Sequence, residues 1–232
     1  MEALIEAANW QQLIQETAAH HAQLIAVSKT KSNAAIQALY DLGQRDFGEN
    51  YVQEFVSKQA SLPKDICWHF IGHLQRNKVK QIVGIATVIH GVDSERLLQE
   101  INKEAAKKNC IQAVLLQYFI AQEETKFGLD AAEIEAIIAQ KEQYAHVQFL
   151  GLMGMATHTT DQHQIKKEFE QVKERRDAAE KLRAGSLGRL SAFKEIIELV
   201  RGSANTELIS KIENLTSQSE AEADRKSTRL NS

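Results

Sequence analysis

Short apolar runs alternate along the chain with longer segments in which apolar residues recur every three or four positions. Several short runs are apolar at both odd and even positions, which is typical of strands in a sheet that is covered on both faces or closed into a barrel. The longer segments have the spacing of amphipathic helices. The pattern predicts six strands, at residues 24–29, 45–50, 67–72, 87–93, 111–120 and 147–157.

A predicted helix follows each of these strands. The first begins at Ser32 or Asn33, both suitable N-caps, and ends at Gly43. Strands that alternate with helices pair in parallel through right-handed crossovers, so we predict an α/β fold with a mostly parallel sheet. The other helices are predicted at residues 51–62, 77–83, 94–109, 131–144 and 164–182.

The composition excludes several classes of protein. The 232 residues carry a formal net charge of only -3, so no basic excess draws the chain to nucleic acid. The longest apolar runs, such as Val114–Ile120, are shorter than the roughly 20 residues that cross a bilayer. The N-terminus lacks a signal-peptide pattern, and two cysteines are too few for a disulfide framework. We expect a cytoplasmic protein without a metal site, a membrane contact or a nucleic-acid partner.

Lys29 stands at the end of the first predicted strand. Its ammonium would lie at the mouth of the sheet above an apolar stem, and loss of hydration disfavours the charged form there. The neighbouring cation Lys31 acts in the same direction. A lysine so placed is a candidate for Schiff-base formation, although position alone also fits an ordinary surface lysine.

Other polar residues lie at or near the ends of the later strands. Asn50 ends the second strand, and His69 lies within the third, where it is either part of a polar ligand site or a hydrogen-bonded core histidine. Lys126 precedes a helix, and by itself it fits a solvated lysine better than a functional one. Thr157 offers a hydroxyl and a backbone amide before a helix, a position suited to anions.

Six segments in this order resemble one known family. They are AVSKTK, GQRDFGENYVQE, WHFIGHLQRNK, HGVDS, EETKFGL and GLMGMAT. Together they resemble the pyridoxal phosphate homeostasis protein family, also called the YggS/PROSC family, over roughly residues 10–175. The resemblance implies a modified TIM-type (β/α) barrel related to the N-terminal domain of alanine racemase.

The resemblance also implies a function. Members of the family bind pyridoxal 5'-phosphate (PLP), and the family's cofactor lysine matches Lys29. Asn50 and His69 match positions on the cofactor side of the barrel, and Lys126 matches a lysine near its mouth. We expect PLP homeostasis by a cofactor carrier that turns over no substrate, so no residue is assigned a catalytic role. PLP-dependent apoenzymes are the expected recipients, and the chain is expected to be a monomer.

The resemblance ends before the chain does. The family's last two strands and phosphate loops are absent, and residues 175 onward read as mixed-charge helix with no histidine. We therefore expect a PLP-binding βα barrel over residues 1–180, truncated by two strands, and a helical or disordered tail over residues 181–232. The ending DRKSTRLNS resembles a translated sequencing adaptor, so we hypothesise that the tail is chimeric.

Two other interpretations stay open. One is a racemase-like or decarboxylase-like enzyme that uses Lys29, which would need a second acid or base on the opposite face of the cofactor. The other is a truncated barrel that does not close and does not retain PLP, because unpaired strand edges and missing phosphate contacts would weaken it.

Overall fold

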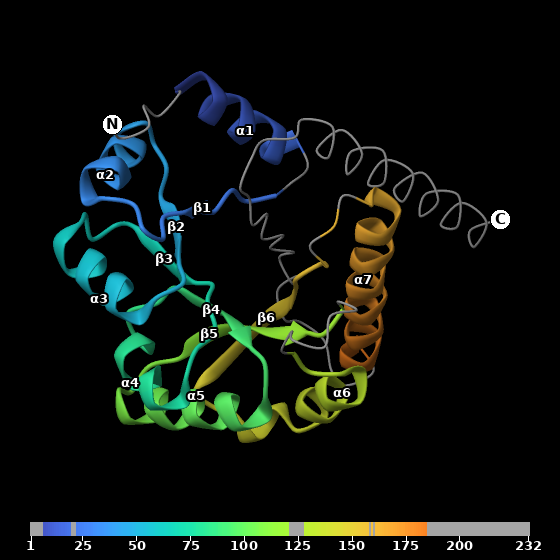
Figure 1. Cartoon of the computed structure of the whole chain (residues 1–232). Coiled ribbons are helices and arrows are strands. Elements are labelled where there is room, and N and C mark those ends of the chain that lie inside the picture. Colours follow the sequence, from blue (N-terminus) through green and yellow to red (C-terminus); the bar gives the residue numbers. More distant parts are fainter. Residues whose placement is uncertain (1–6, 20–21, 121–127, 158, 160, 185–232) are drawn as a thin grey trace. The chain divides into compact units, whose positions relative to one another are not determined.

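A computed structural model describes residues 7–19, 22–120, 128–157, 159 and 161–184 of the chain (Figure 1). Contacts divide the chain into two compact units, one of residues 1–5 and 25–198 and the other of residues 6–24 and 199–232. In the second unit the described helix is α1 (Ala7–Ala19). All further elements belong to the first unit.

The first unit is built on a parallel sheet of six described strands. Its order is β1-β2-β3-β4-β5-β6, so each strand pairs with its neighbours in the chain. This confirms the six predicted strands and their parallel arrangement. In the described residues β1 and β6 form the two edges of the sheet. The strands are β1 (Ala26–Val27), β2 (Asp46–Glu49), β3 (Cys67–Phe70), β4 (Val88–Val92), β5 (Gln112–Tyr118) and β6 (Val147–Gly154).

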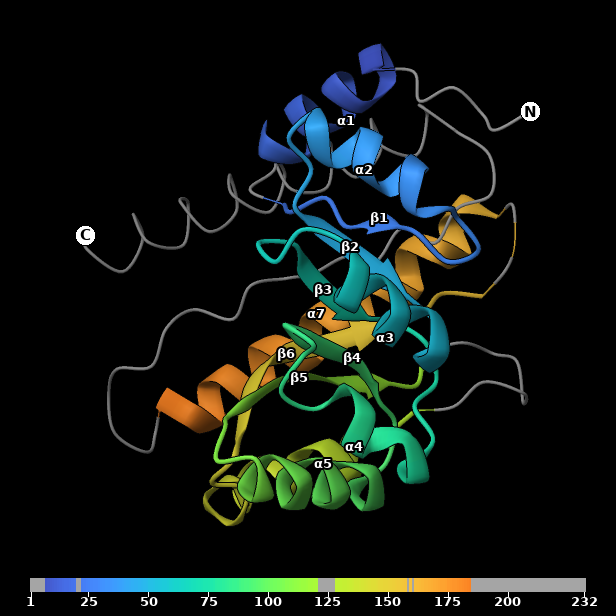
Figure 2. The same cartoon turned by 90° about the vertical axis from the view of Figure 1, so that its left-hand side faces the viewer.

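Helices cover the outer side of the curved sheet (Figure 1). Figure 2 shows α3 and α4 in front of the strands, which agrees with this arrangement. Among the described helices none combines the length and the apolar character needed to cross a membrane. The helices of this unit are α2 (Asn33–Asp41), α3 (Val52–Ser61), η1 (Arg76–Lys78), α4 (Val79–Ile82), α5 (Glu95–Lys107), α6 (Ala131–Ala139), η2 (Lys141–Gln143) and α7 (Gln162–Ala184).

Local sequence signals set the ends of several helices. Ser32 is the N-cap of α2, and its hydroxyl accepts a hydrogen bond from the Ala35 N–H at 3.2 Å. Gly43 follows that helix with φ 110°, a conformation that side chains disfavour, which confirms it as the stop. Asp130 and Glu133 form a capping box at the start of α6.

Two apolar clusters lie on opposite faces of the sheet. The outer face, toward the helices, carries most of the core, including the contacts of Phe55 in α3 with Trp68 and Phe70. A smaller cluster of Val88, Leu115 and Met153 lies on the other face. We call this second face the inner face. Strands covered on both faces explain why the apolar runs lack a clean alternation.

The last described helix passes the expected domain boundary. Because α7 continues to Ala184, a division after residue 180 would fall inside this helix. Most of the expected tail, residues 185–232, lies outside the described residues. The proposed chimeric origin of the tail and the absence of two further strands therefore remain predictions.

Replacing Phe55 by alanine tests the outer core. The Phe55 side chain is fully buried between α3 and β3, with ring centroids 5.9 Å from Trp68 and 6.0 Å from Phe70. Phe55→Ala should lower the free energy of unfolding by about 3–5 kcal/mol because it leaves a cavity. Val56 on the same helix is 37% exposed, so Val56→Ala should cost less than about 0.5 kcal/mol. Equal losses in urea titrations of the two variants would contradict this account of the core.

Candidate functional site

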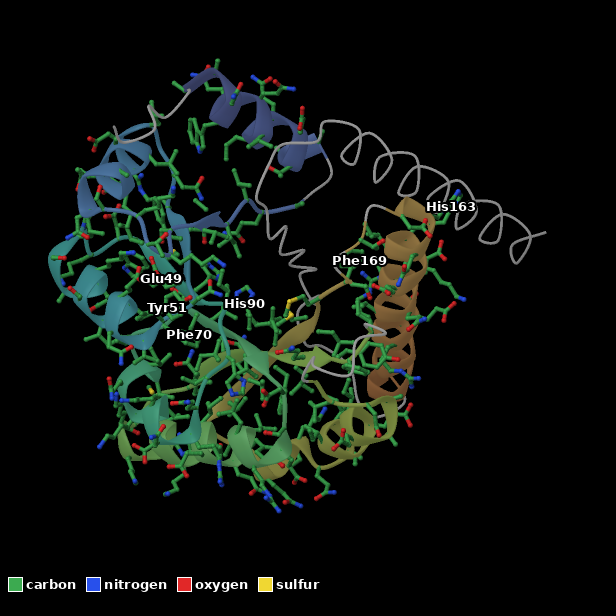
Figure 3. All side chains as sticks on the ribbon, in the orientation of Figure 1. Glu49, Tyr51, Phe70, His90, His163 and Phe169 are labelled. Carbon is green, nitrogen blue, oxygen red and sulfur yellow. The ribbon has the colours of Figure 1, made fainter. Side chains whose placement is uncertain are left out.

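Strand register decides which side chains share the inner face. Gly48 pairs with His69, and His69 pairs with Val88 of the inner cluster. Paired residues on neighbouring strands point to the same face, and successive residues alternate. His69 and His90 therefore lie on the inner face. Figure 3 shows His90 on this side and Glu49 on the side that faces α3.

Lys29 lies in a tight turn immediately after β1. The Ser28 N–H donates to Gly48 O at 2.9 Å, which continues the pairing with β2 and brings Lys29 beside Asn50. The Lys31 N–H donates to Ser28 O at 3.0 Å and closes a four-residue turn with Lys29 at its second position. Lys29 is partly buried at this position.

Thr30, the third residue of this turn, has a strained backbone. Its φ is 62°, which is uncommon for a residue with a branched side chain and costs roughly 1–2 kcal/mol. Its N–H donates to Glu54 Oε2 at 2.8 Å. The turn is therefore held in a conformation that its own sequence does not favour, and a contact from α3 compensates.

A buried ion network lies directly beneath the turn. Lys58 Nζ donates three hydrogen bonds, to Ser28 O at 2.9 Å, Glu49 Oε1 at 2.8 Å and Glu54 Oε2 at 2.7 Å. The Ser28 hydroxyl also donates to Glu49 Oε1, at 2.6 Å. The hydrogen bond from Lys58 holds the pKa of Glu54 below its ordinary value. Lys58 and Glu49 are almost fully buried, so β1, β2 and α3 meet at one desolvated charge cluster.

A second polar chain runs along the inner face. His69 Nε2 lies 3.0 Å from Asp46 Oδ1, and His69 Nδ1 lies 2.9 Å from His90 Nε2. Burial, reinforced by the charge of His69, lowers the pKa of His90 to about 3, so His90 is neutral at pH 7. In the described residues, no group of three or more His, Cys, Asp or Glu side chains is arranged to hold a metal ion.

Because His90 is neutral, one of its two ring nitrogens carries a proton and the other is an acceptor. Ionised Asp46 only accepts, so His69 Nε2 is the donor to it. His69 Nδ1 and His90 Nε2 share one hydrogen bond, so one of these two nitrogens carries the proton between them. The Nδ1 of His90 is buried and has no hydrogen-bond partner among the described residues. The inner face thus presents one ring nitrogen without a partner among the described residues, while both nitrogens of His69 are engaged within the protein.

Asn50 lies at the carboxyl edge of the sheet beside two closely packed glycines. A Cβ atom on Gly72 would lie 2.3 Å from Asn50 O, so only glycine allows β3 to approach β2 here. A Cβ atom on Gly91 would lie 2.9 Å from Gly72 O, which extends the close approach to β4. Asn50 Oδ1 is buried and, within the described part of the chain, without a hydrogen-bond partner. It is an unsatisfied acceptor at the carboxyl ends of the strands.

Thr157 follows β6 and is already bonded within the protein. Its N–H and its hydroxyl both donate to the carboxylate of Glu168 in α7, each at 2.7 Å. Glu168 is buried and also accepts from Gln164 Nε2 at 3.1 Å. The expected anion-binding donors are present before α7, and a carboxylate of the chain itself occupies them. Lys126, the remaining predicted site residue, lies outside the described residues.

Sequence reasoning missed most of the supporting residues. Lys58 and Glu54 look like an ordinary exposed pair four residues apart on a helix, so nothing in the sequence indicates their burial. The signal for His90 was available, because a histidine inside the apolar run 87–93 must find a polar partner. Glu168 gave no signal within its mixed-charge helix.

A family model matches most of the chain. The model, described as alanine racemase, N-terminal domain, matches residues 6–197. The pyridoxal phosphate homeostasis protein of Helicobacter pylori (strain 26695) is 35% identical over 178 residues, which cover 75% of this chain and 80% of that protein. The protein belongs to the pyridoxal phosphate homeostasis protein family.

Further members and solved structures agree with this assignment. The homeostasis protein of Aquifex aeolicus is 36% identical over 67% of this chain and 69% of its own length. The structure of PipY from Synechococcus elongatus with PLP bound is 32% identical, has a TM-score of 0.68 and covers 76% of this chain and 83% of that one. Alanine racemase from Streptomyces coelicolor is 17% identical with a TM-score of 0.63, which shows the shared fold of the family. The expected alanine racemase-like fold is confirmed.

The neutral state of His90 predicts a pH dependence of stability. Its folded pKa of about 3 lies below the ordinary 6.5, so below pH 6.5 the unfolded chain binds a proton that the folded chain does not. Stability should fall as the pH drops from 6.5 toward 3, with a contribution from His90 of about 1.4 kcal/mol per pH unit. His90→Gln should remove this part of the slope in chemical unfolding measured at pH 7, 6, 5 and 4.

A matched control uses His163, which is exposed on α7 (Figure 3). His163→Gln should leave the slope as it is in the unmodified chain. A slope that is equally steep in His90→Gln would show that His90 is not held neutral by burial.

Proposed function

We propose that this protein binds PLP and carries it as a Schiff base on Lys29, as part of intracellular PLP homeostasis. The observation that carries the proposal is the position of Lys29. It lies in a tight turn at the carboxyl ends of the parallel strands, beside Asn50. In barrels of this type, ligands bind at those ends of the strands. The PLP-bound structure of PipY, a protein 32% identical to this chain, supports the same conclusion.

The residues at this edge fit the cofactor. PLP supplies an aldehyde that condenses with an amine. Lys29 would supply the amine that holds the cofactor through this aldehyde. Asn50 Oδ1 and His90 Nδ1 are buried polar atoms with no partner among the described residues, and they suit the polar groups of an aromatic ligand. His69 would orient His90 through their hydrogen bond.

The phosphate end of the ligand needs donors that the chain already uses. Thr157 would bind the phosphate through its N–H and hydroxyl, which now donate to Glu168. The phosphate would have to displace the Glu168 carboxylate, because both anions accept hydrogen bonds from the same two donors of Thr157. Lys126 is proposed as a further cationic contact near the mouth.

We propose a carrier role, without substrate turnover. The names of the relatives support this, since they are called homeostasis proteins. PLP-dependent apoenzymes are the proposed recipients, and the protein is proposed to act as a cytoplasmic monomer, with no nucleic-acid or membrane partner. The two cysteines of the chain, Cys67 and Cys110, are free, in keeping with a reducing compartment.

Replacing Lys29 tests the attachment. The purified full chain is incubated with PLP, treated with borohydride and digested for peptide mapping. The unmodified chain should give a reduced adduct on Lys29 and absorb visible light before reduction. Lys29→Ala should lose both signals, because no amine remains at that position.

The control variant is Lys64→Ala. Lys64 is exposed and precedes β3, so it lies toward the amino ends of the strands. It should retain the adduct and the absorbance. Absence of an adduct on Lys29 in the folded unmodified chain would refute the proposed function.

A separate measurement distinguishes the carrier from an enzyme. Alanine and other amino acids are incubated with the PLP-loaded protein in D₂O, and exchange of the α-proton is followed by NMR. A carrier should show exchange no faster than free PLP. Catalytic exchange that Lys29→Ala abolishes would favour the racemase-like interpretation.

A further inference from the structure

The two peptide groups that flank Lys29 are both held by hydrogen bonds to side chains of α3. The peptide before Lys29 contains Ser28 C=O, which accepts from Lys58 Nζ at 2.9 Å. The peptide after Lys29 contains the Thr30 N–H, which donates to Glu54 Oε2 at 2.8 Å. Rotation of these two peptide planes about the Lys29 Cα is what changes φ and ψ of Lys29. Fixing both planes therefore fixes the direction in which the Lys29 side chain leaves the backbone.

One ion pair supplies both of these contacts. Lys58 Nζ donates to Glu54 Oε2 at 2.7 Å, so the two contacts come from one ion pair on α3. We call this Lys58–Glu54 pair the brace. The remaining ammonium hydrogen of Lys58 goes to Glu49 Oε1 at 2.8 Å. An ammonium has three donors, and all three are used, two of them on acceptors outside α3. We propose that Glu54 and Lys58 are positioning residues that aim the Lys29 amine at the cofactor.

The cost of this arrangement argues against a role in stability alone. A buried ion pair gains little stability over an apolar pair of the same shape, because desolvation of the charges offsets their attraction. Glu49 Oε2 is also buried, and among the described residues it has no hydrogen-bond partner. The brace in addition holds Thr30 at φ 62°, which a relaxed turn would avoid. These costly features all act on the residues that flank Lys29. This indicates that their role is to hold Lys29 in a defined geometry.

The inference rests on the proposed function, because it concerns how the attachment lysine is aimed. Its test compares the rate of PLP attachment at Lys29 with attachment at Lys31, an exposed lysine two residues away on the same turn. In the unmodified chain the adduct should form at Lys29. A variant that only lowers stability should not change how the adduct divides between the two lysines while the protein stays folded.

Glu54→Ala is the main variant. It frees the Thr30 N–H and one hydrogen of Lys58, and it should slow attachment at Lys29 by roughly tenfold to a hundredfold, as expected when a reacting group is misplaced. The share of adduct at Lys31 should rise. Glu54→Gln should recover much of the rate, because its amide oxygen can accept from Thr30 in place of Oε2.

The matched control is Glu100→Ala. Glu100 is 29% exposed and paired with a lysine on α5, whereas Glu54 is 31% exposed and paired with one on α3. Glu100→Ala should attach PLP at Lys29 at the unmodified rate. The double variant Lys58→Met with Glu49→Gln removes the buried charges together, which avoids leaving one unpaired. It should slow attachment as Glu54→Ala does, which tests the inference even where Glu54→Ala fails to fold.

The possible outcomes separate the two proposals. Without an adduct in the unmodified chain, the proposed function fails. The second outcome is an adduct at Lys29 that forms at the same rate and the same site in the folded variants Glu54→Ala and Lys58→Met with Glu49→Gln. The proposed function then stands, and the positioning role of Lys58 and Glu54 is overturned.

Discussion

The need of one buried ammonium for three acceptors organises the part of the sheet on which the proposed site depends. Lys58 comes from α3, yet its partners lie after β1, at the end of β2 and within its own helix. No single element could satisfy it, so burial of this one charge requires that β1, β2 and α3 meet in a defined way. The two-residue strand β1, which has little pairing of its own, is thereby joined to its neighbours.

The two polar systems on either side of the sheet differ in kind. On the outer face, charges of opposite sign meet and every ammonium hydrogen is used. On the inner face, the histidine chain that starts at Asp46 ends at the uncharged ring of His90, whose Nδ1 has no partner among the described residues. The first system suits holding a backbone still, since charge-assisted hydrogen bonds are strong and directional. The second leaves hydrogen-bonding capacity unused where the ligand is proposed to bind.

The fold could be predicted from the sequence to a large extent, because its signals are local. Short apolar runs mark the strands, and the hydroxyl of Ser32 and the freedom of Gly43 mark the ends of a helix. Lys29 and Asn50 could be found for the same reason, since strand ends follow directly from the runs. The Glu54–Lys58 pair could not, because whether a pair on a helix is exposed depends on which surface the helix packs against. Likewise, Glu168 reaches Thr157 only once α7 is packed beside β6.

The order of the strands in the sheet is their order in the chain, and this order affects how the protein can fold. In the described part of the chain each strand pairs only with the strands before and after it in the sequence, so closing each pair requires a loop of one helix and its connections. Short loops are entropically cheap to close, and local contacts favour rapid folding. A sheet of this order could therefore grow one βα unit at a time during synthesis, with a single new edge exposed at each step. All three acceptors of Lys58 lie within residues 28–58, so the ion network beneath Lys29 uses only residues that are synthesised before β3.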